Sequence, residues 1–421
     1  MIKTAFIIFV AALTLSACGA GKIRIVATAD LHGRLTEFAK LAAVMRNYPD
    51  AFKVDAGDLT QGDPVCDLFP HDVMPEILNN LNYDIFVPGN HDFEWGIKNT
   101  QLFAKKFSGK ILIGQCVKAD FPFSRWILLE KGGRRCAFIG FTEDKLISEN
   151  RLLPGYSFRT DTLTVLREIL KEIRAVKPYP DAVVLVWHSS FYTKFGALGQ
   201  ILRDFPEIDV MICAHSHREN PGMRASSALA VQPGAYGSSA ALIEIEFDSR
   251  GRKRATSRLL RPAKEGDREV TAVWKKSAKA AEEKLSEKLY EISSADEFKK
   301  LCAAKIMEKC SAGAVLLENR ELKKRGIITA EDIMKAMPYS NRICLVETDA
   351  AALKTMNENK NSSKNRRYIL FPSGRQESKI ILAVNDYLLR SSPDLQKYKN
   401  SAVPTPFYER EIILDMEKKD E

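Results

Sequence analysis

Short, mostly apolar runs recur through the first half of the chain, and each one ends in a polar segment. The runs cover residues 23–29, 52–56, 85–88, 183–186 and 208–213. Stretches with the spacing of amphipathic helices lie between them, for example residues 161–176. Buried apolar strands that alternate with helices are typical of a parallel sheet. We therefore expect an α/β domain in which several strands end at one edge.

The polar segments at the ends of these runs contain residue types that bind metals. They are Asp30-Leu31-His32, Gly57-Asp58, Gly89-Asn90-His91-Asp92, Trp187-His188 and Ala214-His215-Ser216-His217. The chain has six histidines, and all but His71 lie in these segments. Ligands of open α/β sheets bind beyond the carboxyl ends of strands, so the segments should meet at one site. The alternative is a buried cluster of hydrogen-bonded histidines, but a dry core gains nothing from five of them at strand ends.

These segments resemble the motifs of the calcineurin-like metallophosphoesterases. They occur in the same order, which is D-x-H, G-D, G-N-H-D/E, an isolated His and H-x-H. The longer stretches 28–35, 55–63, 88–96 and 231–237 are similar to the 5′-nucleotidase branch of that superfamily, and the resemblance spans roughly residues 22–250. It implies a four-layer α/β/β/α metallophosphoesterase sandwich. It also implies that a smaller α/β C-terminal 5′-nucleotidase-like domain follows.

The resemblance implies a site for two divalent metal ions. Imidazole and carboxylate ligands suit Mn, Zn or Fe, so the identity of the metals stays open. One ion would take Asp30, His32 and His217, the other Asn90, His188 and His215, and both would share Asp58. His91 would act as the catalytic residue that stabilises the transition state or protonates the leaving oxygen. Related chains usually orient this histidine with an Asp, and here Glu94 takes that place with one methylene more.

The first residues of the chain have the pattern of a bacterial lipoprotein signal peptide. Lys3 is followed by a mostly apolar stretch, residues 4–17, which is too short to span a membrane. Residues 15–18, Leu-Ser-Ala-Cys, resemble a lipobox, which implies cleavage after residue 17 and lipidation of Cys18. We expect a periplasmic or cell-surface protein that is anchored to a bacterial membrane by this lipid. Cleavage as a plain secretory signal stays open as the alternative.

Composition and charge add few constraints. The chain has 421 residues and a formal net charge of +9, but no basic stripe interleaved with aromatics, so we expect no nucleic-acid partner. The basic run at 250–254 predicts a turn between two strands. Eight cysteines occur without a C-x-x-C motif, which leaves one disulfide of unknown pairing open. The oligomeric state is not predictable from the sequence.

The chain is long enough for two domains. We expect a signal peptide at residues 1–17, a catalytic domain at 18–255, a linker with a connecting helix at 256–294, and a substrate-binding domain at 295–421. The connecting helix is predicted at 273–290, where Ala, Lys and Glu dominate.

The second domain resembles the C-terminal 5′-nucleotidase domain more weakly. Residues 326–341 match its G-x-I-T-x-x-D and P-F-G-N patterns, and residues 371–374 and 384–387 match two shorter segments. In the family, two aromatic rings from these motifs enclose the nucleobase, and here they would be Tyr339 and Tyr387. The alternative is that both tyrosines are ordinary, half-buried packing residues.

Other substrate contacts are less well defined, because the sequence departs from the family pattern at 316–325 and 390–394. The resemblance implies contacts to base, ribose or phosphate from Arg320, Arg325, Asn341, Gly374 and Asp394. The expected metal-ligand set is thus complete, whereas these departures indicate a remodelled substrate site.

The sequence thus predicts an extracytoplasmic phosphoesterase that hydrolyses nucleoside 5′-monophosphates or related nucleotides by attack of a metal-bound hydroxide. Two alternatives remain. The same metal centre could act on UDP-sugars, 2′,3′-cyclic nucleotides or non-nucleotide phosphate esters, or the chain could be a non-catalytic binding lipoprotein.

Overall fold

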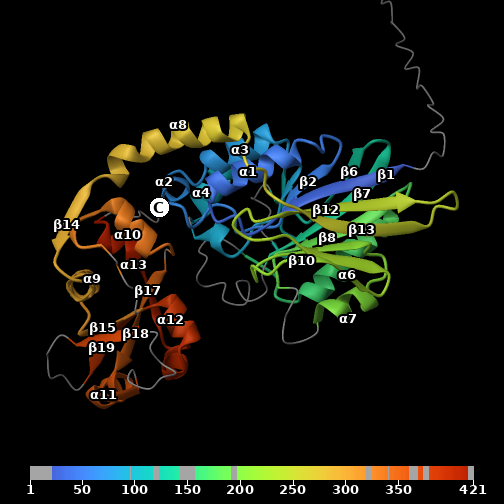
Figure 1. Ribbon diagram of the computed structural model, residues 1–421. Coiled ribbons are helices and arrows are strands. Elements are labelled where there is room, and N and C mark those ends of the chain that lie inside the picture. Colours follow the sequence, from blue (N-terminus) through green and yellow to red (C-terminus); the bar gives the residue numbers. More distant parts are fainter. Residues whose placement is uncertain are drawn as a thin grey trace, which may run out of the picture.

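The structure is a computed structural model, and Figure 1 shows a larger and a smaller body joined by the long helix α8 (Arg268–Leu285). It describes residues 21–94, 96–116, 123–142, 157–190, 197–318, 322, 324–339, 341–359, 368–372 and 379–415. The expected signal peptide and Cys18 lie outside the described residues. Within the described part of the chain, no helix is both long and apolar enough to cross a membrane. None of the seven cysteines described there forms a disulfide.

The first sheet of the larger body contains the first three apolar runs. Its strand order is β13 (Lys253–Leu260), β12 (Ala240–Phe247), β1 (Lys22–Thr28), β2 (Phe52–Asp55), β3 (Ile85–Phe86), β4 (Lys110–Leu112) and β5 (Phe123–Ser124). Strands β1 to β5 are parallel, β12 pairs antiparallel with β1, and β13 pairs antiparallel with β12. The parallel centre confirms the arrangement expected from these three runs, whereas the two later runs lie in a second sheet and not in the same parallel sheet.

The second sheet contains the two later runs. Its order is β10 (Asn220–Ala225), β11 (Ala228–Gln232), β9 (Val210–Cys213), β8 (Ala182–Trp187), β7 (Arg134–Phe141) and β6 (Trp126–Lys131). Strands β7, β8, β9 and β11 are parallel, while β6 and β7 form the expected hairpin. Gly132 and Gly133 turn that hairpin with φ of 58° and 71°, values that favour glycine.

The two sheets pack face to face around an apolar core, and helices cover their outer faces (Figure 1). Side chains such as Ile25, Val54, Val184 and Ile212 fill the space between the sheets. The first sheet is covered by α1 (Leu35–Met45), α3 (Val73–Asn80) and α4 (Gly96–Lys106), and the second by α6 (Thr162–Ala175) and α7 (Ala197–Asp204). The four-layer α/β/β/α arrangement is therefore confirmed.

The connecting helix differs from its expected bounds. It begins at Arg268 and not at residue 273, because the Asp267 carboxylate accepts hydrogen bonds from the first-turn amides of Glu269 and Val270. It ends at Leu285, so the chain can enter β14 (Lys288–Ile292). Strand β13 continues beyond residue 255, the expected end of the catalytic domain, and β14 lies within the expected linker.

The smaller body is an α/β domain with two sheets. Its five-stranded sheet has the order β18 (Tyr368–Pro372), β15 (Ala314–Glu318), β19 (Ile380–Asn385), β17 (Arg342–Thr348) and β20 (Val403–Tyr408), and β14 pairs with β16 (Gly326–Thr329). Its helices are α9 (Ala295–Cys310), α10 (Ala330–Ala336), α11 (Ala350–Asn359), α12 (Asp386–Ser391) and α13 (Glu409–Ile413), with the short 3₁₀ helix η3 (Pro393–Tyr398). Thr329 and Asp332 form a capping box at the start of α10.

The two bodies share part of one apolar core. Helix α2 (Pro64–Leu68) belongs to the larger body, but Val65 packs in the same cluster as Ile333 and Met334 of the smaller one. Helix α8 contacts both α1 and α10. The interface between the bodies therefore includes apolar packing, and the polar contacts across it are described below.

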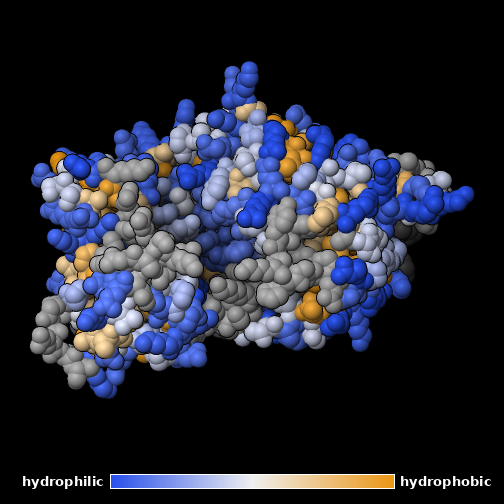
Figure 2. All heavy atoms as spheres, turned by 60° about the horizontal axis from the view of Figure 1, so that its bottom comes forward, coloured by the Kyte–Doolittle hydropathy of each residue, from blue (hydrophilic) through white to orange (hydrophobic). Residues whose placement is uncertain are grey.

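The outer face of the molecule in Figure 2 is mostly hydrophilic, with small separate apolar areas.

Candidate metal centre

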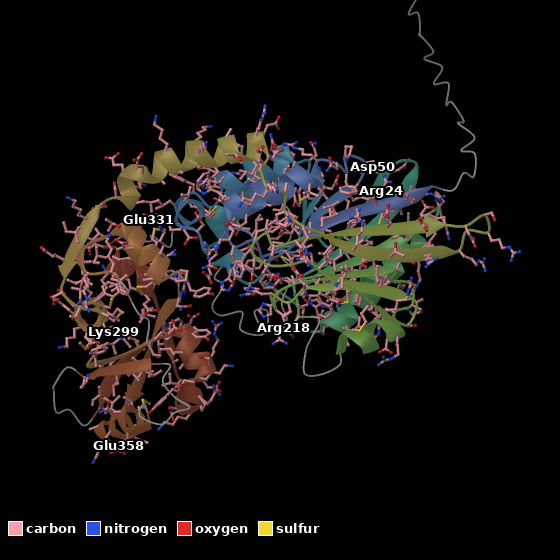
Figure 3. The ribbon with its side chains drawn as sticks, in the orientation of Figure 1. Arg24, Asp50, Arg218, Lys299, Glu331 and Glu358 are labelled. Carbon is pink, nitrogen blue, oxygen red and sulfur yellow. The ribbon has the colours of Figure 1, made fainter. Side chains whose placement is uncertain are left out.

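The polar segments predicted from the sequence converge at the carboxyl ends of both sheets. Asp30 follows β1, Asp58 follows β2, and His188 follows β8 directly. His215 and His217 follow β9, and exposed Arg218 comes next in the loop before β10 (Figure 3). The sandwich thus supplies ligand-type side chains from two different sheets to one site.

Five of these residues have a backbone conformation that non-glycine residues rarely adopt. The φ angles are 50° at Asp30, 47° at His32, 53° at Asp58, 71° at His215 and 56° at His217. Each residue in this left-handed conformation costs on the order of 1 kcal/mol or more of conformational energy, and such strain concentrates at functional sites. The turns direct consecutive polar side chains into a small volume.

The Asp58 carboxylate lies at the centre of the site and is almost fully buried. Its Oδ1 accepts the backbone N–H of His91 at 2.9 Å, and its Oδ2 is 3.2 Å from Nε2 of His188 and 3.8 Å from Nε2 of His32. Burial opposes the charge of Asp58, but the nearby histidines hold its pKa well below the usual value. Asp58 therefore stays ionised between histidines from both sheets.

Two of the histidines are oriented by backbone carbonyls. His188 Nδ1 donates to the carbonyl of Ala56 at 2.7 Å, and His32 Nδ1 donates to the carbonyl of Gln61 at 2.9 Å. These hydrogen bonds place a proton on Nδ1 and direct Nε2 of each ring at the site, as in metal-ligating histidines. His217 Nδ1 lies 3.0 Å from the Tyr236 hydroxyl, which orients that ring in the same way.

Two groups of side chains could each hold a cation, and they share Asp58. The first contains Asp30, His32, Asp58 and His217, and the second contains Asp58, His188 and His215. The Asn90 side-chain oxygen is 3.0 Å from Nδ1 of His215, so it joins the second group. The structure thus brings together every residue for which the sequence predicted a ligand role.

The ring nitrogens in this site fit a cation better than they fit one another. Nε2 of His32 and Nε2 of His217 lie 3.2 Å apart, so two lone pairs face each other when both rings carry their proton on Nδ1. Nε2 of fully buried His188 makes no hydrogen bond among the described residues. Buried polar atoms need partners, and divalent cations would satisfy these nitrogens together with Asp58. The donor set therefore fits divalent metals.

His91 is held by an acid, as expected from its place in the sequence. Glu94 Oε1 lies 2.5 Å from His91 Nδ1. Burial disfavours the imidazolium, but the charges of Glu94 and Asp58 outweigh it and raise the pKa of His91 to about 9. His91 is therefore a cation at neutral pH.

Some residues of the site were not predicted. Asp92 accepts the backbone N–H groups of Asp58, Leu59 and Gly89 at 2.7, 3.0 and 2.8 Å and so fixes the two loops that carry Asp58 and Asn90. Its position in the G-N-H-D segment was the available signal, but its partners are backbone atoms that a side-chain motif does not reveal. Tyr236, next to His217, was also missed as a positioning residue.

Comparison with known proteins identifies this domain. Residues 23–219 match the calcineurin-like phosphoesterase family. These residues form a calcineurin-like metallophosphoesterase domain. The matched segment includes every predicted metal-ligand residue, so the resemblance noted from the sequence is confirmed for the domain.

Individual relatives agree with this assignment. The chain is 27% identical over 251 residues to a 2′,3′-cyclic-nucleotide 2′-phosphodiesterase/3′-nucleotidase from Haemophilus influenzae, covering 47% of this chain and 36% of that protein. It is 23% identical over 286 residues to human 5′-nucleotidase, covering 56% of this chain and 48% of that protein. The chain thus spans about a third to a half of the length of these relatives.

The architecture extends beyond the phosphoesterase domain. The crystal structure of a 5′-nucleotidase precursor from Thermus thermophilus superposes with a TM-score of 0.67 at 16% identity, covering 94% of this chain and 96% of that one. This similarity concerns the fold, and it confirms that the C-terminal domain follows the phosphoesterase domain as expected.

The predicted substrate residues have different surroundings. Tyr339 follows α10, and its ring centre lies 5.2 Å from that of His91 at an angle of 31°. Tyr387, on α12, is 44% exposed. Asn341 is buried, and its backbone carbonyl accepts a hydrogen bond from the backbone N–H of Glu409 at 2.9 Å. Tyr339 thus brings the second domain to the phosphoesterase site.

The remaining substrate predictions have little structural support. Arg325 is exposed just before β16, and Asp394 is half-buried in η3. Arg320 and Gly374 lie outside the described residues. Their proposed contacts stay predictions from the family resemblance.

Proposed function

We propose that this chain is a metal-dependent phosphoesterase that hydrolyses nucleoside 5′-monophosphates or related nucleotides to nucleoside and phosphate outside the cytoplasm. The observation that carries the proposal is Asp58, whose buried carboxylate is common to two metal-binding groups at the carboxyl ends of two sheets. A carboxylate shared in this way is typical of two-metal phosphoesterases.

The proposed ligand roles follow from the two groups. Asp30, His32 and His217 would hold one ion, Asn90, His188 and His215 would hold the other, and Asp58 would serve both. Two divalent ions, Mn, Zn or Fe, would polarise the phosphoryl group and acidify water for the attack at phosphorus. The ligand types do not distinguish among these metals.

His91 is proposed to donate the proton that the leaving oxygen needs. Its pKa of about 9 keeps it protonated at neutral pH, and Glu94 fixes the ring through Nδ1. Nε2 is then the nitrogen that can donate to the leaving oxygen or to a phosphoryl oxygen.

Tyr339 and Tyr387 are proposed to hold the base. Their side chains are 37% and 44% exposed, so part of each ring faces solvent. An exposed aromatic ring beside the site offers a flat face to a nucleobase. Because Tyr339 contacts His91, a base stacked on it would lie close to the reacting phosphate.

A second candidate substrate is a 2′,3′-cyclic nucleotide. The relative from Haemophilus influenzae that carries this activity in its name is 27% identical, compared with 23% for human 5′-nucleotidase. The chain covers less than half of each protein, so identity alone does not choose between them. UDP-sugars and non-nucleotide esters use the same chemistry at phosphorus.

The cellular location is proposed from the lipobox-like sequence at Cys18. Lipidation of that thiol would tether the enzyme to the outer face of a bacterial membrane. Incorporation of labelled palmitate into the full-length protein, and its loss in Cys18→Ser, is the expected result. Palmitate-free protein released into the periplasm would contradict the anchor and favour a plain secretory signal.

Phosphate release tests the proposed activity. The soluble form that begins after Cys18, loaded with Mn or Zn, should hydrolyse AMP, and Asp58→Asn should lose both bound metal and turnover. Parallel assays with 3′-AMP, 2′,3′-cyclic AMP, UDP-glucose and p-nitrophenyl phosphate rank the alternatives. Bound metal without turnover on any ester would instead support a non-catalytic binding protein.

A further inference from the structure

The turn that carries Tyr339 is held from both domains. This turn, residues 337–339, follows α10 in the second domain. The Gln61 side-chain amide, from the first domain, donates a hydrogen bond to the carbonyl of Pro338. Arg410 of α13 lies 3.5 and 3.3 Å from the carbonyls of Met337 and Pro338.

Gln61 also contacts the proposed metal centre. It is fully buried, and both its backbone carbonyl and its side-chain oxygen accept from His32 Nδ1, at 2.9 and 3.1 Å. The oxygen end of one amide therefore faces a proposed metal ligand, while its nitrogen end faces the second domain. An amide presents its acceptor and donors at fixed angles, so these two contacts fix the side chain in one orientation.

A buried ion pair supports the same turn. Arg410 Nη1 lies 2.5 Å from Asp67 Oδ2, and the two side chains are 2% and 1% exposed. Asp67 belongs to α2 of the first domain, so this pair also crosses the interface. Asp67 accepts the backbone N–H of Gly62 at 3.1 Å, which ties the ion pair to the loop that carries Gln61.

We propose that Gln61 is a positioning residue that sets nucleotide affinity by holding the 337–339 turn, and with it Tyr339, against the metal centre. This inference rests on the proposed nucleotidase function. Without the amide donor, the carbonyl of Pro338 loses its partner in the first domain, and the ring of Tyr339 is no longer fixed beside His91. A substrate without a base does not use Tyr339, so its hydrolysis should depend less on Gln61.

The variant Gln61→Met tests whether Gln61 couples the metal centre to the 337–339 turn, because Met has a similar length but cannot donate a hydrogen bond. The backbone carbonyl of residue 61 still accepts from His32, so Mn affinity measured by calorimetry should change less than threefold. The ratio of kcat/KM for AMP to that for glycerol 2-phosphate, which has no ring to stack on Tyr339, should fall at least tenfold, mainly through KM for AMP. Gln61→Asn, which keeps the amide but is one methylene shorter, should give the same change.

Gln115 provides the matched control. It is also fully buried, and its amide also donates to a carbonyl, that of Thr142 at 3.1 Å, but both residues belong to the first domain. Gln115→Met should leave the ratio of the two kcat/KM values within about twofold of the parent. Equal losses on AMP and glycerol 2-phosphate in Gln61→Met, or a parallel loss of Mn affinity, would overturn the inference.

Hydrogen exchange gives a readout that needs no turnover. The peptide that contains residues 337–339 should exchange at least tenfold faster in Gln61→Met than in the parent, while Gln115→Met should not change it. Unchanged exchange would refute the coupling. A parent protein that hydrolyses no ester would refute the proposed function alone, because the exchange measurement would still decide whether Gln61 holds the turn.

Discussion

Replacing Arg410 by Met should destabilise the protein, and the loss should grow with pH. The side chains of Arg410 and Asp67 are almost fully buried and lie 2.5 Å apart. Removing one member of a buried pair leaves the other charge uncompensated, which costs about 3–5 kcal/mol. Met retains much of the apolar stem of Arg, so most of this cost comes from the charge.

The pH dependence follows from the pKa of Asp67. Burial raises that pKa to about 6, although Arg410 lowers it. The folded protein thus binds the proton of Asp67 more tightly than the unfolded chain does. The free energy that this proton contributes to stability therefore falls as the pH rises, until the pH exceeds the pKa in the folded protein. Without Arg410 the pKa of Asp67 rises further. Between about pH 6 and this new pKa, the free energy of unfolding of Arg410→Met therefore falls by about 1.4 kcal/mol more per pH unit than that of the parent.

Urea unfolding at pH 6 and pH 8 measures this difference. If the new pKa exceeds 8, the free-energy loss of Arg410→Met should grow by about 2–3 kcal/mol between the two pH values. Arg252 is the control, because its side chain is 74% exposed where it pairs with Asp248. Arg252→Met should cost less than about 1 kcal/mol at both pH values. A loss for Arg410→Met that does not change with pH would refute this reasoning.

Three further predictions concern the catalytic site. His91→Ala should lower kcat by about 10²–10⁴ while the metal content by mass spectrometry stays unchanged, and loss of metal would mean that His91 is a ligand. Because Glu94 helps to raise the pKa of His91 to about 9, activity that needs the imidazolium should fall as the pH rises through about 9. In Glu94→Gln this alkaline limb should move to lower pH, and an unmoved limb would assign it to another group. Tyr339→Ala should raise KM for AMP at least tenfold with a smaller change in kcat, and an unchanged KM would remove Tyr339 from the base site.

The strands and the metal centre were predictable because their signals are local. A parallel strand buried on both faces needs consecutive apolar residues, and the loop after it carries the ligand-type side chains. Segments such as Asp30-Leu31-His32 therefore showed both their secondary structure and their chemistry in a few residues. The start of α8 was missed because Asp267 acts through the backbone amides that it caps, outside the periodic pattern.

The sequence by itself determined the α/β class, the apolar runs that become strands ending in polar segments, and the residue types of the candidate metal centre. Only the tertiary structure decided that Asp92 fixes two loops through backbone amides, and that Gln61 and Arg410 contact carbonyls of the turn that carries Tyr339. Gln61 and Pro338 are 277 residues apart, and Asp67 and Arg410 are 343 apart. Hydrophobic periodicity indicates which side of an element is buried. It does not show which distant polar atom contacts that element, because that contact depends on how the two domains pack against each other.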